Sequence, residues 1–418
     1  MIDFHVKKNN FLYIIFIFVL LFIIFPGCKK KENETKPSNK KSLEKCINST
    51  LPSPHKQKKI AKEINADSKK HSIDTFFQRN VNAGFNGAVL VEQRGVLLYK
   101  NAKGLSNLRT KDSLNFSSTF QLASISKIFT GVAVLQLVEK GKIHLNDTIQ
   151  KFIPKFPYHG ITVGNLLSHR SGLPNYLYSF EDKRRENATP PDNKGLIDWF
   201  ITADPQIKPE AFPNRKFQYN NTNYAVLARI VEIVTKKPFA GYMRDKIFLP
   251  VGMKSTYIDT IAPPELLQTK VTGYEGRRER TREIWDGVYG DKGMYSNVDD
   301  MLKWYHALRS GCLVSKALLD SAFIPRSVES PSRHNYGYGF RLMTNRHDMS
   351  KVHYVYHGGW WNGFTNMFWM DYEHDFVIIL LSNKRNRNSY NVKPIIQILD
   401  NLSPEEYDAK FFSALDDL

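Results

Sequence analysis

Cysteine is scarce in this sequence. The 418 residues include only three cysteines, Cys28, Cys46 and Cys312, which is too few for a disulfide framework. Cys46 lies in a polar, lysine-rich stretch and Cys312 in the part that reads as globular. A bridge between these two is one alternative, but we expect both to stay unpaired. The fold must then rest on a hydrophobic core, for which 42% hydrophobic residues give ample material.

Acidic residues are too few to balance the basic ones, and the formal net charge is +18. The excess is uneven, because residues 29–70 hold 13 lysines and only five acidic residues. Such a run can serve nucleic acid, an anionic membrane or an acidic polymer. It lacks interleaved aromatics, and no nucleic-acid-binding motif stands out. We therefore expect no nucleic-acid partner and interpret residues 29–70 as a flexible, solvated linker.

No apolar run is long enough for an ordinary membrane span. The longest, Phe11 to Phe25, has 15 residues, which cover about 22 Å of a roughly 30 Å hydrocarbon core. Lys7 and Lys8 precede it and Gly27-Cys28 follow, so residues 1–28 resemble a bacterial lipoprotein signal. We expect Cys28 to carry a lipid that tethers the chain to a membrane of the cell envelope. An uncleaved anchor and an ordinary secreted protein are the alternatives.

The order of expected elements indicates an α+β fold. Strand patterns occur early and late, and a mainly helical block over 145–245 separates them. The simplest assembly is an antiparallel sheet built from both ends of the domain and flanked by helices, with a helical subdomain inserted. The domain should cover residues 71–402, followed by a helical tail over 403–418. The expected strands are 87–100 (two, with a turn at 93–95), 351–356, 364–370 and 376–382.

A serine and a lysine open a strongly apolar helix. Ser124 and Lys127 are three residues apart, at the start of a helical pattern that runs from Ile125 to Glu139, so they share one face. A serine hydroxyl needs a neighbouring base to become a nucleophile. A lysine serves as that base when burial or a nearby positive charge lowers its pKa. Alone, the pattern is also that of an ordinary helix start.

Two further motifs follow at long separations. Tyr219 and Asn221 stand two apart in a polar loop, where a phenol can move protons and an amide can hold a substrate. His357, Gly359 and Trp360 lie at the end of a strand-like run, where glycines allow close backbone approach and N–H groups can stabilise an oxyanion. A packed loop and a strand-ending turn are the respective structural alternatives.

Together, in this order, the three motifs resemble the serine β-lactamase and penicillin-binding-protein superfamily. The stretches 161–176, 249–256, 290–304 and 336–340 are also similar to segments of that family, so the resemblance covers roughly residues 75–390. It implies the β-lactamase/transpeptidase fold and an enzyme that needs no cofactor or metal. There is no Gly-x-Ser-x-Gly elbow, which argues against an α/β-hydrolase. We interpret His169, in the first of these stretches, as a structural hydrogen-bonding residue.

The resemblance also implies a mechanism. Ser124 would attack a carbonyl and form an acyl-enzyme, with Lys127 and Tyr219 moving protons, and water would then release the acyl group. The N–H groups of Ser124 and Trp360 would form the oxyanion hole, and Asn221 would contact Lys127 and the substrate.

One departure concerns the third motif, which begins with His357 where many relatives carry lysine. A histidine is mostly neutral at pH 7, so peptidase or esterase activity is expected more than β-lactamase activity. The substrate would be a cell-wall D-amino peptide, a β-lactam or a small ester. The alternative function is a catalytically silent binding lipoprotein with the same fold. The sequence does not determine the oligomeric state.

Overall fold

A seven-stranded antiparallel sheet forms the centre of the molecule. The computed structural model describes residues 38–186, 188–189, 191–329, 332–345, 348–385 and 391–411. The predicted signal segment with Cys28, and the end of the predicted tail, lie outside these residues. None of the helices in the described ranges combines the length with the apolarity that a bilayer span requires.

The sheet joins the two ends of the domain, as the sequence predicts. Its strand order is β10-β11-β12-β13-β14-β1-β2, and β1 pairs with β14 so that Gly87 lies opposite Ser382. The strand bounds are β1 Gly87–Gln93, β2 Val96–Lys103, β10 His334–Tyr336, β11 Arg341–Thr344, β12 Val352–Trp361, β13 Phe364–Asp371 and β14 Phe376–Ser382.

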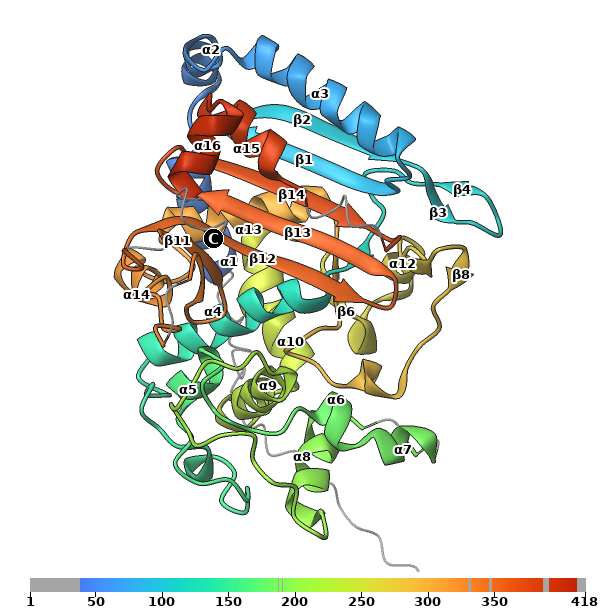
Figure 1. Ribbon diagram of the computed structural model, residues 1–418, viewed down its shortest axis with the longest axis vertical. Coiled ribbons are helices and arrows are strands. Elements are labelled where there is room, and N and C mark those ends of the chain that lie inside the picture. Colours follow the sequence, from blue (N-terminus) through green and yellow to red (C-terminus); the bar gives the residue numbers. More distant parts are fainter. Residues whose placement is uncertain are drawn as a thin grey trace, which may run out of the picture. The chain divides into compact units, whose positions relative to one another are not determined.

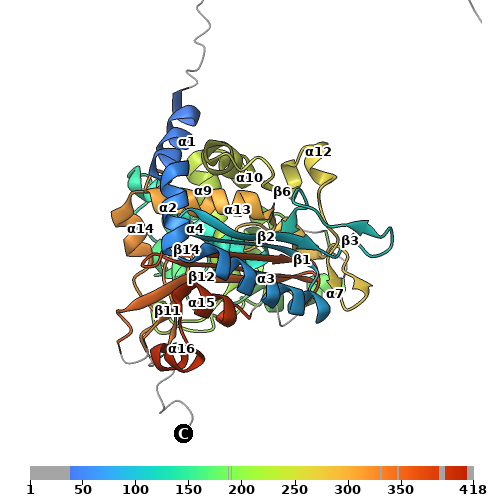
Figure 2. The same cartoon turned by 90° about the horizontal axis from the view of Figure 1, so that it is seen from above.

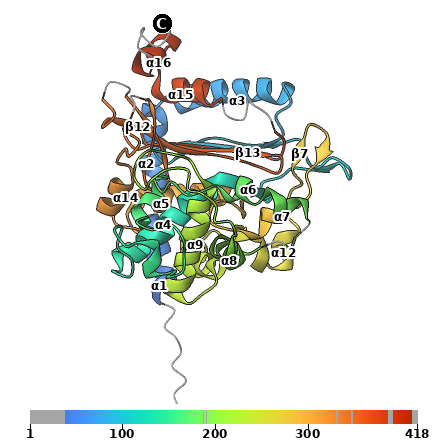
Figure 3. The same cartoon turned by 60° about the horizontal axis from the view of Figure 1, so that its bottom comes forward.

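Both faces of the sheet are covered, and the two-residue period of the strands divides the core into two layers. On β14, Val377, Ile379 and Leu381 join the larger core, whereas the alternate residues Phe376, Ile378 and Leu380 join the smaller one. Figure 3 shows α3 (Ala66–Asn82), α15 (Lys393–Asp400) and α16 (Pro404–Phe411) on one side of the sheet and most of the other helices on the opposite side. Burial on both faces of the sheet explains why strands such as β14 are apolar at every position.

The helical region lies between the early and late strands of the chain (Figure 1). Its centre is α4 (Ser126–Glu139), whose residues from Ser126 to Leu137 are all buried. A helix this apolar on every side belongs in a core. The other main helices are α5 Val163–Leu167, α6 Tyr176–Ser179, α7 Glu181–Arg185, α8 Asn193–Thr202, α9 Asn221–Thr235, α10 Phe239–Met243, α11 Leu249–Val251, α12 Pro264–Leu267, α13 Val298–Ser310 and α14 Lys316–Ala322.

A small three-stranded sheet supports the start of α4. Its strands are β5 (Phe120–Gln121), β9 (Met294–Ser296) and β6 (Tyr257–Ile258), in the order β5-β9-β6. Leu122 N–H donates to Met294 O at 2.7 Å, which holds the chain just before Ser124. The expected helical tail is present as α16 (Pro404–Phe411) within the described residues.

The flexible linker predicted for residues 29–70 is wrong from Ser38 onward. This stretch forms α1 (Ser38–Thr50), α2 (Pro54–Glu63) and the start of α3, as Figure 2 shows. Sparse apolar residues suffice to dock these helices, because Ile47 joins the larger core and Ile60 the smaller one. Lys69 is also buried, and its ammonium donates to Leu399 O at 2.6 Å. In a stretch so rich in lysine, these few apolar residues gave no recognisable helical pattern.

The expectation of unpaired cysteines is also wrong. Cys46 on α1 is bonded to Cys312, which follows α13, with their Cα atoms 6.2 Å apart. The two residues are 266 apart in sequence, and no local pattern links them. The bridge fastens α1 to the segment that follows α13. Disulfides of this kind form and persist in an oxidising compartment.

This bridge gives a stability prediction. Cys46→Ser should lower the free energy of unfolding by about 2–4 kcal/mol, because the unfolded chain gains the freedom of a long loop. Urea denaturation would measure this change, and reduction of the unaltered protein should reproduce it. Cys28→Ser is the matched control and should have no such effect. Equal stability of the Cys46→Ser and Cys28→Ser proteins would contradict a structural role of the bridge.

Candidate active site

Ser124 lies at the junction between a 3-10 turn and helix α4. The turn covers Ala123–Ile125 and α4 begins at Ser126, so the start of the helix places positive dipole near the hydroxyl. Ala123 has φ of 50°, a left-handed conformation that costs energy for a residue with a side chain. Such strain is common where a reactive group must be held in one orientation.

Lys127 is fully buried directly beside Ser124. Its Nζ donates three hydrogen bonds: to Ser124 Oγ at 3.1 Å, Asn221 Oδ1 at 2.8 Å and the Asp291 backbone oxygen at 3.0 Å. These three acceptors come from three separate segments of the chain. The Ser124–Lys127–Asn221 arrangement predicted from the motifs is therefore present.

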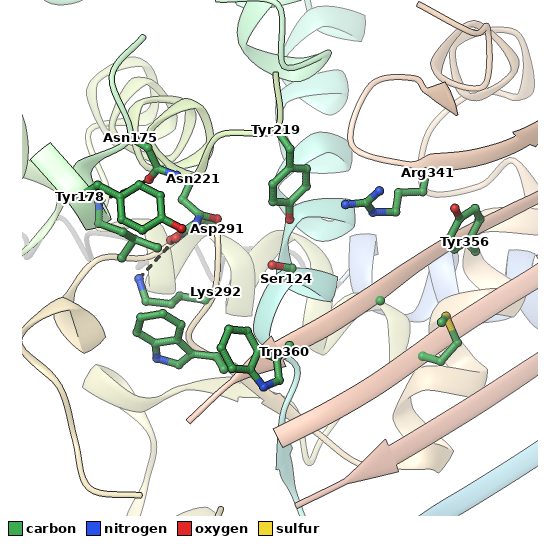
Figure 4. Close-up of a pocket in the computed structure, with 14 residues that line it drawn as sticks. Ser124, Asn175, Tyr178, Tyr219, Asn221, Asp291, Lys292, Arg341, Tyr356 and Trp360 are labelled. Atoms are coloured by element: carbon green, nitrogen blue, oxygen red, sulfur yellow. Dashed lines mark hydrogen bonds and ion pairs between the residues drawn. The ribbon is translucent and has the colours of Figure 1, made fainter. Parts of the chain in front are cut away.

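Tyr219 covers the same ammonium. The centre of its ring lies 4.9 Å from Lys127 Nζ, within the range of a cation–π contact. Figure 4 shows its hydroxyl directed toward Ser124. Tyr219 thus occupies the position that a proton-moving phenol would need.

His169 holds the Tyr219 loop in place, as expected for a structural residue. Its Nδ1 accepts from Asn220 N–H at 3.1 Å, and its backbone oxygen accepts from Gln218 N–H at 2.8 Å. These bonds flank Tyr219 on both sides. Burial, followed by the positive field of Lys127, lowers the pKa of His169 well below its usual value. A neutral imidazole is consistent with its role as an acceptor.

Strand β12 runs through the third motif instead of ending before it. Gly359 faces the Ser124 turn, and a Cβ there would lie 2.1 Å from Leu122 O, so only glycine allows this close approach. Trp360 follows and is 51% exposed. The strand edge thus reaches the nucleophile, which is the arrangement that an oxyanion hole made by Ser124 and Trp360 requires.

His357 does not face the substrate space. Its side chain is buried, with Nε2 3.1 Å from Tyr336 Oη and Nδ1 2.7 Å from Gly358 O. Burial, then the positive charges of Arg341 and Lys127, lower its pKa well below the usual value. The His357 ring lies 6.3 Å from the Tyr219 ring, and its assignment as a substrate-binding residue stays a prediction. Gly358 lines the pocket, whereas the His357 side chain does not.

The pocket over Ser124 has a volume of about 530 Å³. Trp360, Trp361 and the 77% exposed Tyr178 give it aromatic walls, which suits a planar or apolar part of a substrate. The other lining residues are Ser124, Asn175, Leu177, Tyr219, Asn221, Asp291, Lys292, Arg341, Tyr356, Gly358 and Met367.

Arg341 is a pocket residue that the sequence analysis missed. Its guanidinium stacks 4.8 Å from the Tyr219 ring centre (Figure 4). The nearby phenol oxygens of Tyr219 and Tyr356 raise its pKa despite burial, so it stays charged. No ion pair of Arg341 with a carboxylate occurs among the residues that the structure describes. The segment 336–340 immediately before Arg341 carried part of the family resemblance, and this was the available signal.

Asp291 and Lys292 were also missed. Both are almost completely buried, at 1% and 3% exposure, and both line the pocket. Lys292 Nζ lies 3.3 Å from Asp291 Oδ2, and Tyr176 Oη donates to the same oxygen at 2.7 Å. An adjacent acid and base between glycines, in a stretch already noted for its family likeness, would have indicated them.

The pocket shows no set of metal ligands within the described chain. The group that could hold a metal there is Asp371, His374 and Asp400, which does not line the pocket. His374 Nδ1 already lies 2.9 Å from Asp371 Oδ2.

Comparison with known proteins decides the family. The family model described as Beta-lactamase matches residues 73–402, which is most of the chain. The chain belongs to the beta-lactamase family. The resemblance drawn from the three motifs is thus confirmed, and so is the α+β fold. As a member of the beta-lactamase family, the protein is a serine hydrolase that acts through an acyl-enzyme on an amide or ester.

Several members of the beta-lactamase family are similar over most of the chain. Penicillin-binding protein 4* of Bacillus subtilis is 31% identical over 346 residues, covering 78% of this chain and 74% of the relative. Teichoic acid D-alanine hydrolase of Staphylococcus aureus is 26% identical over 391 residues, covering 91% and 92%. The crystal structure of FmtA from Staphylococcus aureus matches with a TM-score of 0.66 at 25% identity, covering 81% of this chain and 90% of that one.

The buried state of His357 predicts a loss of stability in acid. Its pKa is lowered on folding, so below about pH 6.5 the unfolded chain binds a proton that the folded protein excludes. The free energy of unfolding should therefore fall as pH decreases from 6.5, by up to about 1.4 kcal/mol per pH unit for this group.

Denaturation of the protein and of His357→Gln between pH 5 and 7.5 tests this. Glutamine retains a donor and an acceptor but does not titrate, so the variant should show a shallower decline by up to about that amount. The other histidines are common to both proteins and cancel in the comparison. Parallel declines would show that His357 titrates normally in the folded state.

Proposed function

We propose that the protein hydrolyses a D-amino-acyl amide or ester that carries a negative charge near the scissile carbonyl. The observation that supports this is Arg341, a charged guanidinium in the pocket wall that has no carboxylate partner among the described residues. The side chains that line the pocket include two cations, Arg341 and Lys292, and one carboxylate, Asp291. An anionic group of the substrate would neutralise the remaining positive charge.

In this proposal Ser124 is the nucleophile. Lys127, as the free amine, accepts the hydroxyl proton while the Ser124 oxygen bonds to the substrate carbonyl carbon. The N–H groups of Ser124 and Trp360 stabilise the resulting oxyanion. Tyr219 passes a proton to the leaving amine or alcohol, and Asn221 orients Lys127 and the substrate. Water then attacks the acyl-enzyme, which restores Ser124 and releases the acid.

The names of two relatives are consistent with the D-amino-acyl part of this substrate. One is a teichoic acid D-alanine hydrolase, and one structural neighbour is a D-amino acid amidase. The former shares 26% identity over 91% of this chain. A D-amino acid joined to an envelope polymer, by an ester or a peptide bond, is the substrate class that this chain is proposed to take.

Arg341→Gln tests the charge requirement. For an N-acylated D-Ala-D-Ala peptide, the variant should lose about tenfold to one hundredfold in kcat/KM, because a charge-assisted bond is worth about 1.5–3 kcal/mol. For the same peptide with a C-terminal amide the loss should be much smaller. Steady-state kinetics on the two substrates measures the difference.

Arg385→Gln is the matched control for this measurement. Its guanidinium stacks 4.9 Å from the Trp360 ring but is already paired with Glu275, so neither substrate should be affected strongly. If Arg341→Gln reduced both substrates equally, or neither, the anionic substrate class would be rejected.

We also propose that Cys28 is the site of lipid attachment, with the hydrolase held at a membrane of the bacterial cell envelope. The apolar run ending at Gly27-Cys28 and the disulfide, which forms outside the reducing cytosol, support this. Nine residues lie between Cys28 and Ser38, where α1 begins. The ten Cα–Cα steps from Cys28 to Ser38 span at most about 36 Å, so the lipid would keep the domain close to the membrane.

Cys28→Ala should move the protein from the membrane fraction to the soluble exported fraction or leave it as an uncleaved precursor. Fractionation with metabolic fatty-acid labelling measures this. Cys46→Ala is the control and should keep the label. A fatty-acid label on the Cys28→Ala protein would contradict Cys28 as the attachment site.

A further inference from the structure

Two buried lysines meet at one residue of the active site. The backbone oxygen of Asp291 accepts from Lys127 Nζ at 3.0 Å. The carboxylate of the same residue lies 3.3 Å from Lys292 Nζ. Lys292 is only 3% exposed and its ammonium lies between the Tyr176 and Trp361 rings, at 5.0 and 5.1 Å from their centres. The mechanism above uses Lys127 and assigns nothing to Lys292.

The Asp291 carboxylate would by itself hinder that mechanism. A negative charge on the residue whose backbone oxygen accepts from Lys127 favours the ammonium form of that lysine, and the ammonium cannot take a proton from Ser124. Low polarity around the buried site strengthens the effect. A compensating positive charge is therefore needed on the far side of the carboxylate. His357, the residue at the usual cation position of the third motif, is buried and neutral and does not supply it.

Lys292 is the group that contacts this carboxylate. Tyr176 donates to the same oxygen, Asp291 Oδ2, and also contacts Lys292 Nζ. Burial lowers the pKa of Lys292, and Asp291 opposes this effect. The charged or titratable groups that face the two lysines are Asp286, Asp291, Tyr176, Tyr219, Tyr224, His169, His357 and, across the Tyr219 ring, Arg341.

We infer that Lys292 is a positioning residue that neutralises Asp291 and so keeps Lys127 able to act as the free amine at neutral pH. The inference rests on the proposed role of Lys127 as the base. It also explains why Asp291 and Lys292 lie side by side in an almost completely buried part of the pocket wall. The pair holds the backbone oxygen that orients Lys127 and adds no net charge next to Lys127. Lys292 acts through Lys127 and does not need to contact the substrate.

The sign of the charge left behind determines what each substitution does. Lys292→Met leaves the carboxylate unbalanced, so the acidic limb of the kcat/KM profile should move to higher pH by about one unit or more. Asp291→Asn leaves the ammonium unbalanced and should move the limb to lower pH. The double variant, Asp291→Asn with Lys292→Met, removes both charges, and its limb should return close to that of the unaltered enzyme. Lys292→Arg keeps the cation and should keep the limb.

The experiment combines two readouts on the full chain. The first is the pH dependence of kcat/KM for a D-amino-acyl ester across the four variants. The second is direct titration of the Lys127 amine by NMR of protein labelled with 15N-lysine. The double variant contains neither charge of the Asp291–Lys292 pair, so it remains informative together with Asp291→Asn if Lys292→Met does not fold.

The inference is supported if the acidic limb of Lys292→Met lies at a higher pH than that of the unaltered enzyme, and the limb of Asp291→Asn lies at a lower pH. The limb of the double variant should lie close to that of the unaltered enzyme. Equal limbs in all folded variants, or a double variant that fails to move back toward the unaltered enzyme, would overturn it. If the NMR titration of Lys127 follows this order while the kinetic limb does not move, Lys292 does control Lys127 but Lys127 is not the base, and the proposed function is what fails.

Discussion

The active site depends on how one buried amine is accommodated. Lys127 is 0% exposed, and a buried amine is costly unless it is hydrogen-bonded. Its three hydrogen-bond partners come from the turn before α4, the start of α9 and the loop before β9. The requirement to satisfy this one group therefore brings together segments 94 and 164 residues apart along the chain. The pocket is the space that remains above these converging segments.

The rest of the fold keeps those segments in register. The seven-stranded sheet closes the domain by pairing its first strand with its last, and β12 carries Gly359 to within contact of the Ser124 turn. His169 fixes both sides of the Tyr219 loop. Because each contact is tight, a small displacement of either element would separate the hydroxyl, the amine and the phenol. The catalytic geometry therefore depends directly on the packing of the core.

The sequence was sufficient for the elements with strong local signals. Alternating or continuous apolar runs located β1, β2, β13 and β14, and the motif residues Ser124, Lys127, Tyr219 and Asn221 do converge. What it could not indicate are features set by long-range contacts. The docking of α1 rests on a few apolar residues in a lysine-rich stretch, and the Cys46–Cys312 bridge joins residues 266 apart. The burial of His357 against Tyr336 is also a contact that no local pattern indicates. The positions of Arg341 and Lys292 in the pocket depend on residues that are distant in the sequence.

The central claim is that the Ser124 oxygen becomes covalently acylated during turnover. Rapid acid quenching of the enzyme with a slowly hydrolysed D-amino-acyl ester, followed by mass spectrometry of its peptides, tests this most directly. The account predicts a transient acyl mass on the peptide that contains Ser124, formed and lost at the turnover rate and absent from Ser124→Ala. Turnover with no acyl mass on that peptide at any time, or an acyl group on another residue, would contradict it.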